Sequence, residues 1–101
     1  NKDWLYYAYN QSMLGGLSLA HRQYDDAYQL FHSALDYQEL LNCPMGIAQG
    51  HLDFADFYLH KGDVLSAKKS FTKAQSVVQT KNLKQVLVLL SAMEKKIDSF
   101  K

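Results

Sequence analysis

The sequence predicts an all-α fold in which antiparallel helix pairs stack on one another, and two observations indicate it. First, the chain repeats itself at an offset of roughly forty residues, so that the segment 27–34 recurs as 67–74 with Ala, Phe and Ala at matching positions. A period of this length is typical of stacked helical repeats. Second, apolar residues recur three and four positions apart, and no segment keeps the two-residue period of a strand. We therefore expect an α-α solenoid of about five helices.

The first two helices are expected at about residues 3–21 and 24–41. Asp3 is a candidate N-cap for the first, because a carboxylate accepts hydrogen bonds from free backbone N–H groups. One face of this helix carries mostly small or apolar residues: Trp4, Ala8, Gln11, Leu14, Gly15 and Ser18. Asp25 and Asp26 fall in the first turn of the second helix, where the helix dipole favours negative charge.

Three more helices are expected at about residues 44–60, 64–80 and 83–100. Pro44 suits the first turn of the third helix because proline has no N–H to leave unpaired. Gly62 and Asp63 are typical of a helix end followed by a new N-cap. The fifth helix matches the third better at an offset of 39 residues than of 40, because 39 aligns its apolar residues with the aromatic ones of the third.

Composition excludes several classes of function. Eleven Lys and Arg balance ten Asp and Glu, and this gives a net charge of +1, so we expect no nucleic-acid binding. The single cysteine, Cys43, excludes an internal disulfide and fits a small residue at a helix boundary. No apolar run approaches the length of a membrane span. We expect no membrane insertion and a cytoplasmic location, with a periplasmic sensor domain of a membrane-anchored protein as the alternative.

The third helix concentrates the residues that could carry chemistry: His51, Asp53, Asp56 and His60. A metal site usually needs three or four converging ligands, and only Asp56 and His60 share a helix face. His51 falls at an inward position and is interpreted as a packed histidine. No phosphate-binding loop or nucleophile motif occurs. We therefore expect no metal, no cofactor and no enzymatic activity.

These residues resemble the tetratricopeptide repeat family. The matching positions of the two units are Leu14-Gly15, Tyr24-Asp25-Asp26-Ala27, Phe31 and Ala34, then Phe54-Ala55, Tyr58, Gly62-Asp63, Ala67, Phe71 and Ala74. The first unit departs from the pattern with Ser18 where Tyr is usual and Arg22 where Gly is usual. The segment 42–48, with Asn first and Gly-Ile-Ala last, is similar to the longer, forty-residue variety of bacterial signalling and regulatory proteins.

The resemblance implies a single domain over residues 1–101 that is part of a larger protein, with units at about 3–42 and 43–82 and an extra helix at 83–100. It implies a right-handed superhelix of helix pairs, and a non-catalytic scaffold that binds a peptide or a neighbouring domain on its concave face. The family's groove positions fall on Tyr9, Ser12, Gly16, Leu19, Gln49, Leu52, Asp56, His60, Val88, Ser91 and Lys95.

The alternative function is a sensory or autoregulatory domain that controls an attached cyclase, kinase or DNA-binding domain. Apolar residues at both ends of the chain favour it, because a free repeat array normally covers its ends with polar caps. The partner would then be another part of the same chain. A homodimer through the terminal helices is a further expectation.

Overall fold

The computed structural model describes residues 2–100, with side chains described from Tyr6 onward. Within this range the chain forms five α-helices and one short 3₁₀ turn, and no strand. The predicted cap Asp3 and the stripe residue Trp4 lie outside the described side chains. The elements are α1 (Lys2–Ala20), α2 (Tyr24–Leu40), α3 (Pro44–His60), α4 (Val64–Lys81), η1 (Lys84–Val86) and α5 (Leu87–Ser99).

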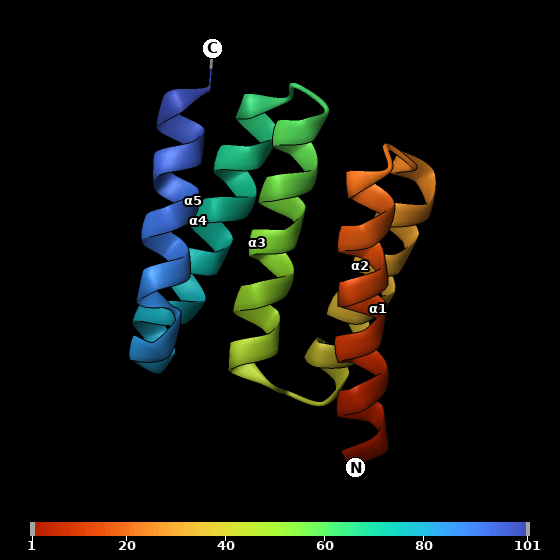
Figure 1. Ribbon diagram of the computed structural model, residues 1–101. Helices are drawn as coiled ribbons and strands as arrows, with labels where there is room; N and C mark the ends of the chain where they lie inside the picture. Colours follow the sequence, from red (N-terminus) through yellow and green to blue (C-terminus); the bar gives the residue numbers. More distant parts are fainter. Residues whose placement is uncertain (1, 101) are drawn as a thin grey trace.

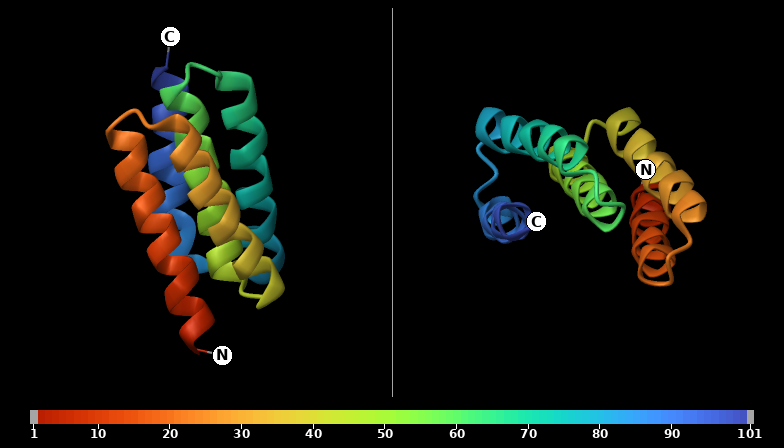
Figure 2. Two further views of the ribbon diagram at one scale, coloured as in Figure 1. Left: turned by 90° about the vertical axis from the view of Figure 1, so that its right-hand side faces the viewer. Right: turned by 90° about the horizontal axis from the view of Figure 1, so that it is seen from above.

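The helices form antiparallel pairs that stack side by side, as the sequence predicts (Figure 1). Each helix packs on the next along the chain, and α3 also contacts α1 and α5. Seen from above, α1, α3 and α5 lie along one side of the array, and α2 and α4 lie along the other (Figure 2). The molecule measures 42 × 31 × 17 Å, so it is a thin curved layer and not a closed bundle.

The turns between helices share one backbone feature at intervals of about twenty residues. Arg22, Asn42, Gly62 and Asn82 have φ angles of 61°, 52°, 80° and 54°. This left-handed conformation ends a helix and reverses the chain, and glycine and asparagine adopt it most readily. Arg22 has the same conformation although arginine has a Cβ atom that disfavours it.

The core consists of two clusters that meet at α3. Leu19, Ala27, Phe31, Phe54 and Phe57 form the first, between α1, α2 and α3. The second fills the space between α3, α4 and α5: Ala48, Leu52, Ala55, Leu59, Ala67, Ala74, Val78, Val86, Leu90, Met93 and Ile97. The repeated alanines and Phe31 are therefore core residues, which confirms their interpretation as the packing skeleton of the repeat.

Glycines allow the closest helix contacts in the first pair and at the α2–α3 junction. A Cβ atom at Gly15 would lie 2.7 Å from the ring of Phe31, and one at Gly50 would lie 2.7 Å from Leu35. Both distances are shorter than van der Waals contact. Leu14, the neighbour of Gly15, is instead half exposed, although the sequence pattern places it on the inner stripe.

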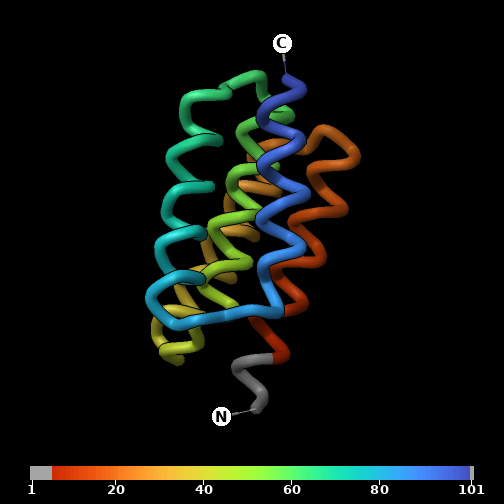
Figure 3. Tube along the Cα trace, turned by 90° about the vertical axis from the view of Figure 1, so that its left-hand side faces the viewer, coloured from red at the N-terminus to blue at the C-terminus, as the bar shows by residue number. Residues whose placement is uncertain are grey.

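The fifth helix begins later than predicted. Residues 84–86 form a 3₁₀ turn, and the α-helix starts at Leu87, whereas the sequence predicts a continuous helix from residue 83. Figure 3 shows how the connection crosses from the end of α4 before α5 rises in front of α3. Because a 3₁₀ turn winds more tightly than an α-helix, it changes which residues of α5 face its neighbours.

Candidate functional site

A groove runs along α3 on the side of the array where α1 and α5 flank it. It consists of three hollows with volumes of about 250, 190 and 550 Å³. The first and second share Gln49, Asp53 and Leu89, and the second and third share Asp56 and Lys96. We call this continuous surface the α3 groove. A depression of about 520 Å³ on α2 is lined by that helix alone.

The lining of the groove differs from one end to the other. The first hollow, beside the start of α3, is lined by amide, hydroxyl and apolar groups and a single carboxylate: Tyr9, Ser12, Ala34, Gln38, Met45, Gly46, Gln49, Gly50, Asp53, Gln85, Val86 and Leu89. The third hollow, at the opposite end, contains one acidic side chain and three basic or imidazole side chains: Asp56, Leu59, His60, Lys95, Lys96, Ser99 and Phe100. The groove is thus chemically polarised along its length.

Asp53 joins α1 to α3 beside the first hollow. Its Oδ2 atom accepts a hydrogen bond of 2.5 Å from Ser12 Oγ, and its Oδ1 atom accepts one of 3.0 Å from Gln49 Nε2. Burial raises the pKa of Asp53 to about 6, and the two hydrogen bonds only partly oppose this effect. The negative charge of Asp56 adds a smaller increase. Asp53 therefore titrates close to neutral pH.

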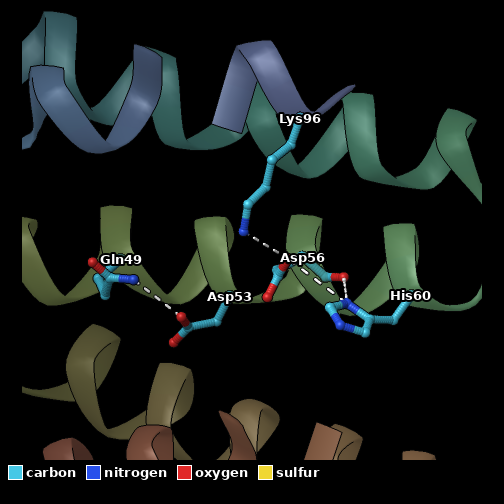
Figure 4. A network of polar contacts seen from close by, with 5 residues as sticks. All are labelled: Gln49, Asp53, Asp56, His60 and Lys96. Carbon is cyan, nitrogen blue, oxygen red and sulfur yellow. Dashed lines mark hydrogen bonds and ion pairs between the residues drawn. The ribbon is translucent and has the colours of Figure 1, made fainter. Parts of the chain in front are cut away.

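Asp56 lies one turn farther along α3 and is paired with a cation. Lys96 Nζ lies 3.4 Å from Asp56 Oδ1, and the two residues connect α5 to α3 (Figure 4). His60 Nδ1 lies 2.9 Å from the main-chain oxygen of Asp56 and 3.7 Å from its Oδ1 atom. Lys96 therefore balances the charge of Asp56 beside the second and third hollows, which both residues line.

Most of the groove residues that the resemblance implies lie on this surface. Tyr9, Ser12 and Gln49 line the first hollow, Asp56 lines the second and third, and His60 lines the third. Gly16 is exposed on α1 but lines none of the three hollows. Apart from its own stretch of helix, no atom lies within 4 Å of the position that its Cβ would take, so this part of α1 is open.

Two leucines are placed differently from the expectation. Leu19 is 2% exposed and packs in the cluster of Phe31 and Phe57. Leu52 is 3% exposed and only forms the floor of the second hollow. Both side chains point into the helix interfaces, so they belong to the core and not to the open surface.

The α5 residues of the groove are shifted by one position. Leu89, Ala92 and Lys96 line the second hollow, whereas the sequence predicts Val88, Ser91 and Lys95. Val88 is 76% exposed. Neither Val88 nor Ser91 lines any of the three hollows. Lys95 does reach the third hollow. The 39-residue offset aligns the core residues of α5, but the groove face follows the 40-residue offset that relates 49 to 89 and 56 to 96.

The other residues in and next to α3 that could carry chemistry show no arrangement of a functional site. Burial lowers the pKa of His51, and the nearby charge of Lys73 lowers it further while that of Glu39 opposes the change. His51 is half-buried, as a packed histidine should be. Among the side chains of residues 6–100, no three of His, Cys, Asp or Glu are grouped so that they could hold a metal ion. Cys43 precedes α3 at its N-cap position.

Comparison with known proteins adds no assignment. No protein-family model, curated protein or solved structure matches the chain. In the part of the chain that the structure describes, no helix is both long enough and apolar enough to cross a membrane. The helical repeat architecture and the α3 groove are therefore the observations on which a function has to rest.

Proposed function

We propose that this chain is a non-catalytic protein-interaction module of the tetratricopeptide-repeat type, and that the α3 groove binds a peptide or a segment of a neighbouring domain. The observation that carries the proposal is the continuity of the three hollows, which share lining residues along almost the whole of α3. Solenoid proteins use extended concave surfaces of this kind to bind extended segments.

The chemistry of the groove supports a peptide ligand. Leu89 and Met45 are each 45% exposed in the first hollow, beside the amides of Gln49 and Gln85. Exposed apolar side chains next to fixed hydrogen-bonding groups suit a chain that carries both kinds of group. The sequence pattern of residues 42–48 further supports a place in a bacterial signalling or regulatory protein, as in the family variety that it resembles.

A peptide selection followed by binding measurements tests the groove. Peptides would be selected from a random library on the folded chain, and their affinity measured by fluorescence polarisation. Leu89→Arg should weaken binding by about tenfold or more, because it places a charge in the middle of the groove. Leu65→Arg is the matched control, since Leu65 is 68% exposed on α4 and lines none of the three hollows. Equal affinity in both variants, with circular dichroism showing intact helices, would contradict the groove assignment.

The second candidate is a regulatory domain that docks other parts of its own chain, and one exposed surface favours it. Tyr6, Tyr9, Met13 and Leu17 recur on a single face of α1, and each is at least 57% exposed. Apolar stripes of this kind mark contact sites. If a longer chain docks here, hydrogen exchange of α1 should slow in that chain relative to residues 1–101 alone. If the chain instead forms a homodimer through this face, its sedimentation coefficient should increase with protein concentration. Met13→Glu should then abolish this increase.

A further inference from the structure

The first hollow of the α3 groove presents a carboxylate without a countercharge and an amide oxygen without a hydrogen-bond partner. It contains one carboxylate, Asp53, and no basic side chain among its lining residues. The side-chain oxygen of Gln38, which also lines the hollow, is shielded from solvent and has no hydrogen-bond partner. An unpaired acceptor in such a position costs free energy until a donor reaches it.

We propose that the first hollow binds a basic side chain, arginine or lysine, of the peptide that occupies the α3 groove. The inference rests on the proposed function and specifies the chemistry of its ligand. A guanidinium group has five N–H donors and no acceptor, and an ammonium group has three. Either group supplies N–H donors that the carboxylate of Asp53 can still accept.

The contacts of Asp53 leave room for such a ligand. Ser12 and Gln49 each donate one hydrogen bond to it, one to each carboxylate oxygen. A carboxylate accepts about four hydrogen bonds, so about half of its capacity remains. The same two hydrogen bonds fix the orientation of the carboxylate before a ligand arrives, so less entropy is lost on binding.

Apolar side chains beside the carboxylate suit the stem of a basic residue. Met45 and Leu89 are partly exposed in the same hollow, and Val86 is buried beside them. Lysine and arginine cover apolar surface with their methylene groups while the charged end reaches a polar site. A short acidic side chain would leave both the apolar surface and the carboxylate of Asp53 unused, and a short neutral polar side chain would not cover the apolar surface.

The charges around Asp53 favour a cation in this hollow and not in the next. Asp56, the other carboxylate of the groove, is already paired with Lys96 at 3.4 Å. The groups that surround Asp53 are the hydroxyl of Ser12 on α1, the amide of Gln49 and the carboxylate of Asp56 on α3. None of them is positive. Lys96 lines the second hollow together with Asp53, but it is paired with Asp56, so the first hollow itself contains no countercharge for Asp53.

This environment makes binding depend on pH. Burial holds the pKa of Asp53 at about 6, so the carboxylate is largely neutral below that pH and charged above it. A bound cation interacts more strongly with the charged form and should lower this pKa. Affinity for a basic peptide should therefore rise between pH 5 and pH 7.

The test uses two peptides whose ends are capped and therefore uncharged. One is acetyl-Leu-Arg-Leu-amide, and the other has citrulline in place of arginine, which keeps the shape of the side chain without its charge. Each is titrated into the folded chain at pH 7.5, and binding is followed by the NMR signals of the side-chain amides of Gln49 and Gln85. The arginine peptide should bind about fivefold more tightly or better, consistent with one partly buried charge-assisted contact. Asp53→Asn should remove this difference, whereas Asp98→Asn, at an exposed position of α5, should preserve it.

The possible outcomes are distinct. Equal affinity of the two probes, or a difference that persists in Asp53→Asn, overturns the basic-side-chain site, and so does the absence of any shift at Gln49 and Gln85. Peptides selected from the library that bind the groove without a basic residue would leave the proposed function standing while overturning this inference. Conversely, selected peptides that bind outside the groove would overturn the proposed function itself.

Discussion

Ser12 on α1 donates a hydrogen bond of 2.5 Å to Asp53 on α3, and it thereby joins two helices that are separated by the whole of α2 in the sequence. Gln49 completes the arrangement from one turn earlier on α3. The carboxylate lines the α3 groove where its first and second hollows meet, so one side chain connects the packing of the repeat with its candidate binding surface. Its surroundings give a first prediction about stability.

Asp53→Asn should change how stability depends on pH. The folded-state pKa of Asp53 is raised to about 6, so folding favours its protonated form. The associated stabilisation is present at low pH and is lost as pH rises through about 6. A raise of about two units corresponds to at most about 3 kcal/mol, and we expect about 2 because the site is partly solvated. As the pH rises from 4 to 7, the stability of the variant relative to that of the natural chain should therefore increase by about 2 kcal/mol.

Urea unfolding at several pH values, followed by circular dichroism, measures this difference. Burial lowers the pKa of His51, so its protonation on acidification also destabilises the fold. That effect is common to both chains and cancels in the comparison. A difference between variant and natural chain that stays constant from pH 4 to pH 7 would show that Asp53 has an ordinary pKa.

The adjacent glycines of α1 should respond in opposite ways to alanine. A Cβ at Gly15 would lie 2.7 Å from the buried ring of Phe31, so Gly15→Ala should destabilise the fold by about 1–3 kcal/mol through overpacking. Gly16 has open space around the same position, so Gly16→Ala should stabilise it by about 0.5–1 kcal/mol through helix propensity. Denaturant titrations of both variants measure these changes. If both substitutions were stabilising, the contact between α1 and Phe31 would have to be looser than described.

Arg22→Gly should stabilise the first turn. Arg22 has a φ of 61°, which disfavours any residue with a Cβ atom, and Gly62 occupies the equivalent place in the next unit at 80°. We expect a gain of about 1 kcal/mol, reduced somewhat by the greater freedom of glycine in the unfolded chain. Thermal unfolding of this variant and of Gly62→Ala, which should have the opposite effect, measures it. A lower midpoint for Arg22→Gly would mean that the arginine side chain makes a compensating contact.

Gln23→Ser should stabilise the start of α2. Gln23 and Asp63 have nearly the same backbone angles, φ −90° and ψ 75° against φ −96° and ψ 80°. The side chain of Asp63 accepts hydrogen bonds from the backbone N and the hydroxyl of Ser66, whereas Gln23 makes no capping bond. A serine there should add about 1 kcal/mol by capping α2. Urea unfolding tests this prediction, and an unchanged midpoint would count against it.

The architecture could be predicted from the sequence because packing between helices depends on residue size and spacing. The repeated Ala27, Phe31 and Ala34 are buried as expected, and so are their counterparts Ala67 and Ala74. The bounds of α3 agree with the prediction because Pro44 begins the helix and Gly62 ends it through local backbone preferences. Such features act over a few residues, so they can be recognised in one sequence.

The residues of the groove could be predicted only in part from the sequence. Tyr9, Ser12, Gln49 and Asp56 follow from the repeat, but the sequence placed Leu19 on the surface and assigned α5 by the offset of its core residues. A signal did exist, since the 40-residue offset relates Gln49 to Leu89 and Asp56 to Lys96. Two registers were therefore present in α5, and the sequence alone did not indicate which one the groove follows.

The sequence by itself determined the helices, their turns and the small residues that bring the helices together, because these depend on local conformation and side-chain volume. Only the tertiary structure decided that Ser12 reaches Asp53, that Lys96 and not Lys95 pairs with Asp56, and that the side-chain oxygen of Gln38 is left without a hydrogen-bond partner. These relationships depend on the rotation of α5 after its 3₁₀ turn and on the approach of α1 to α3. Both are set by packing between segments far apart in the chain, where a small rotation changes which side chains meet.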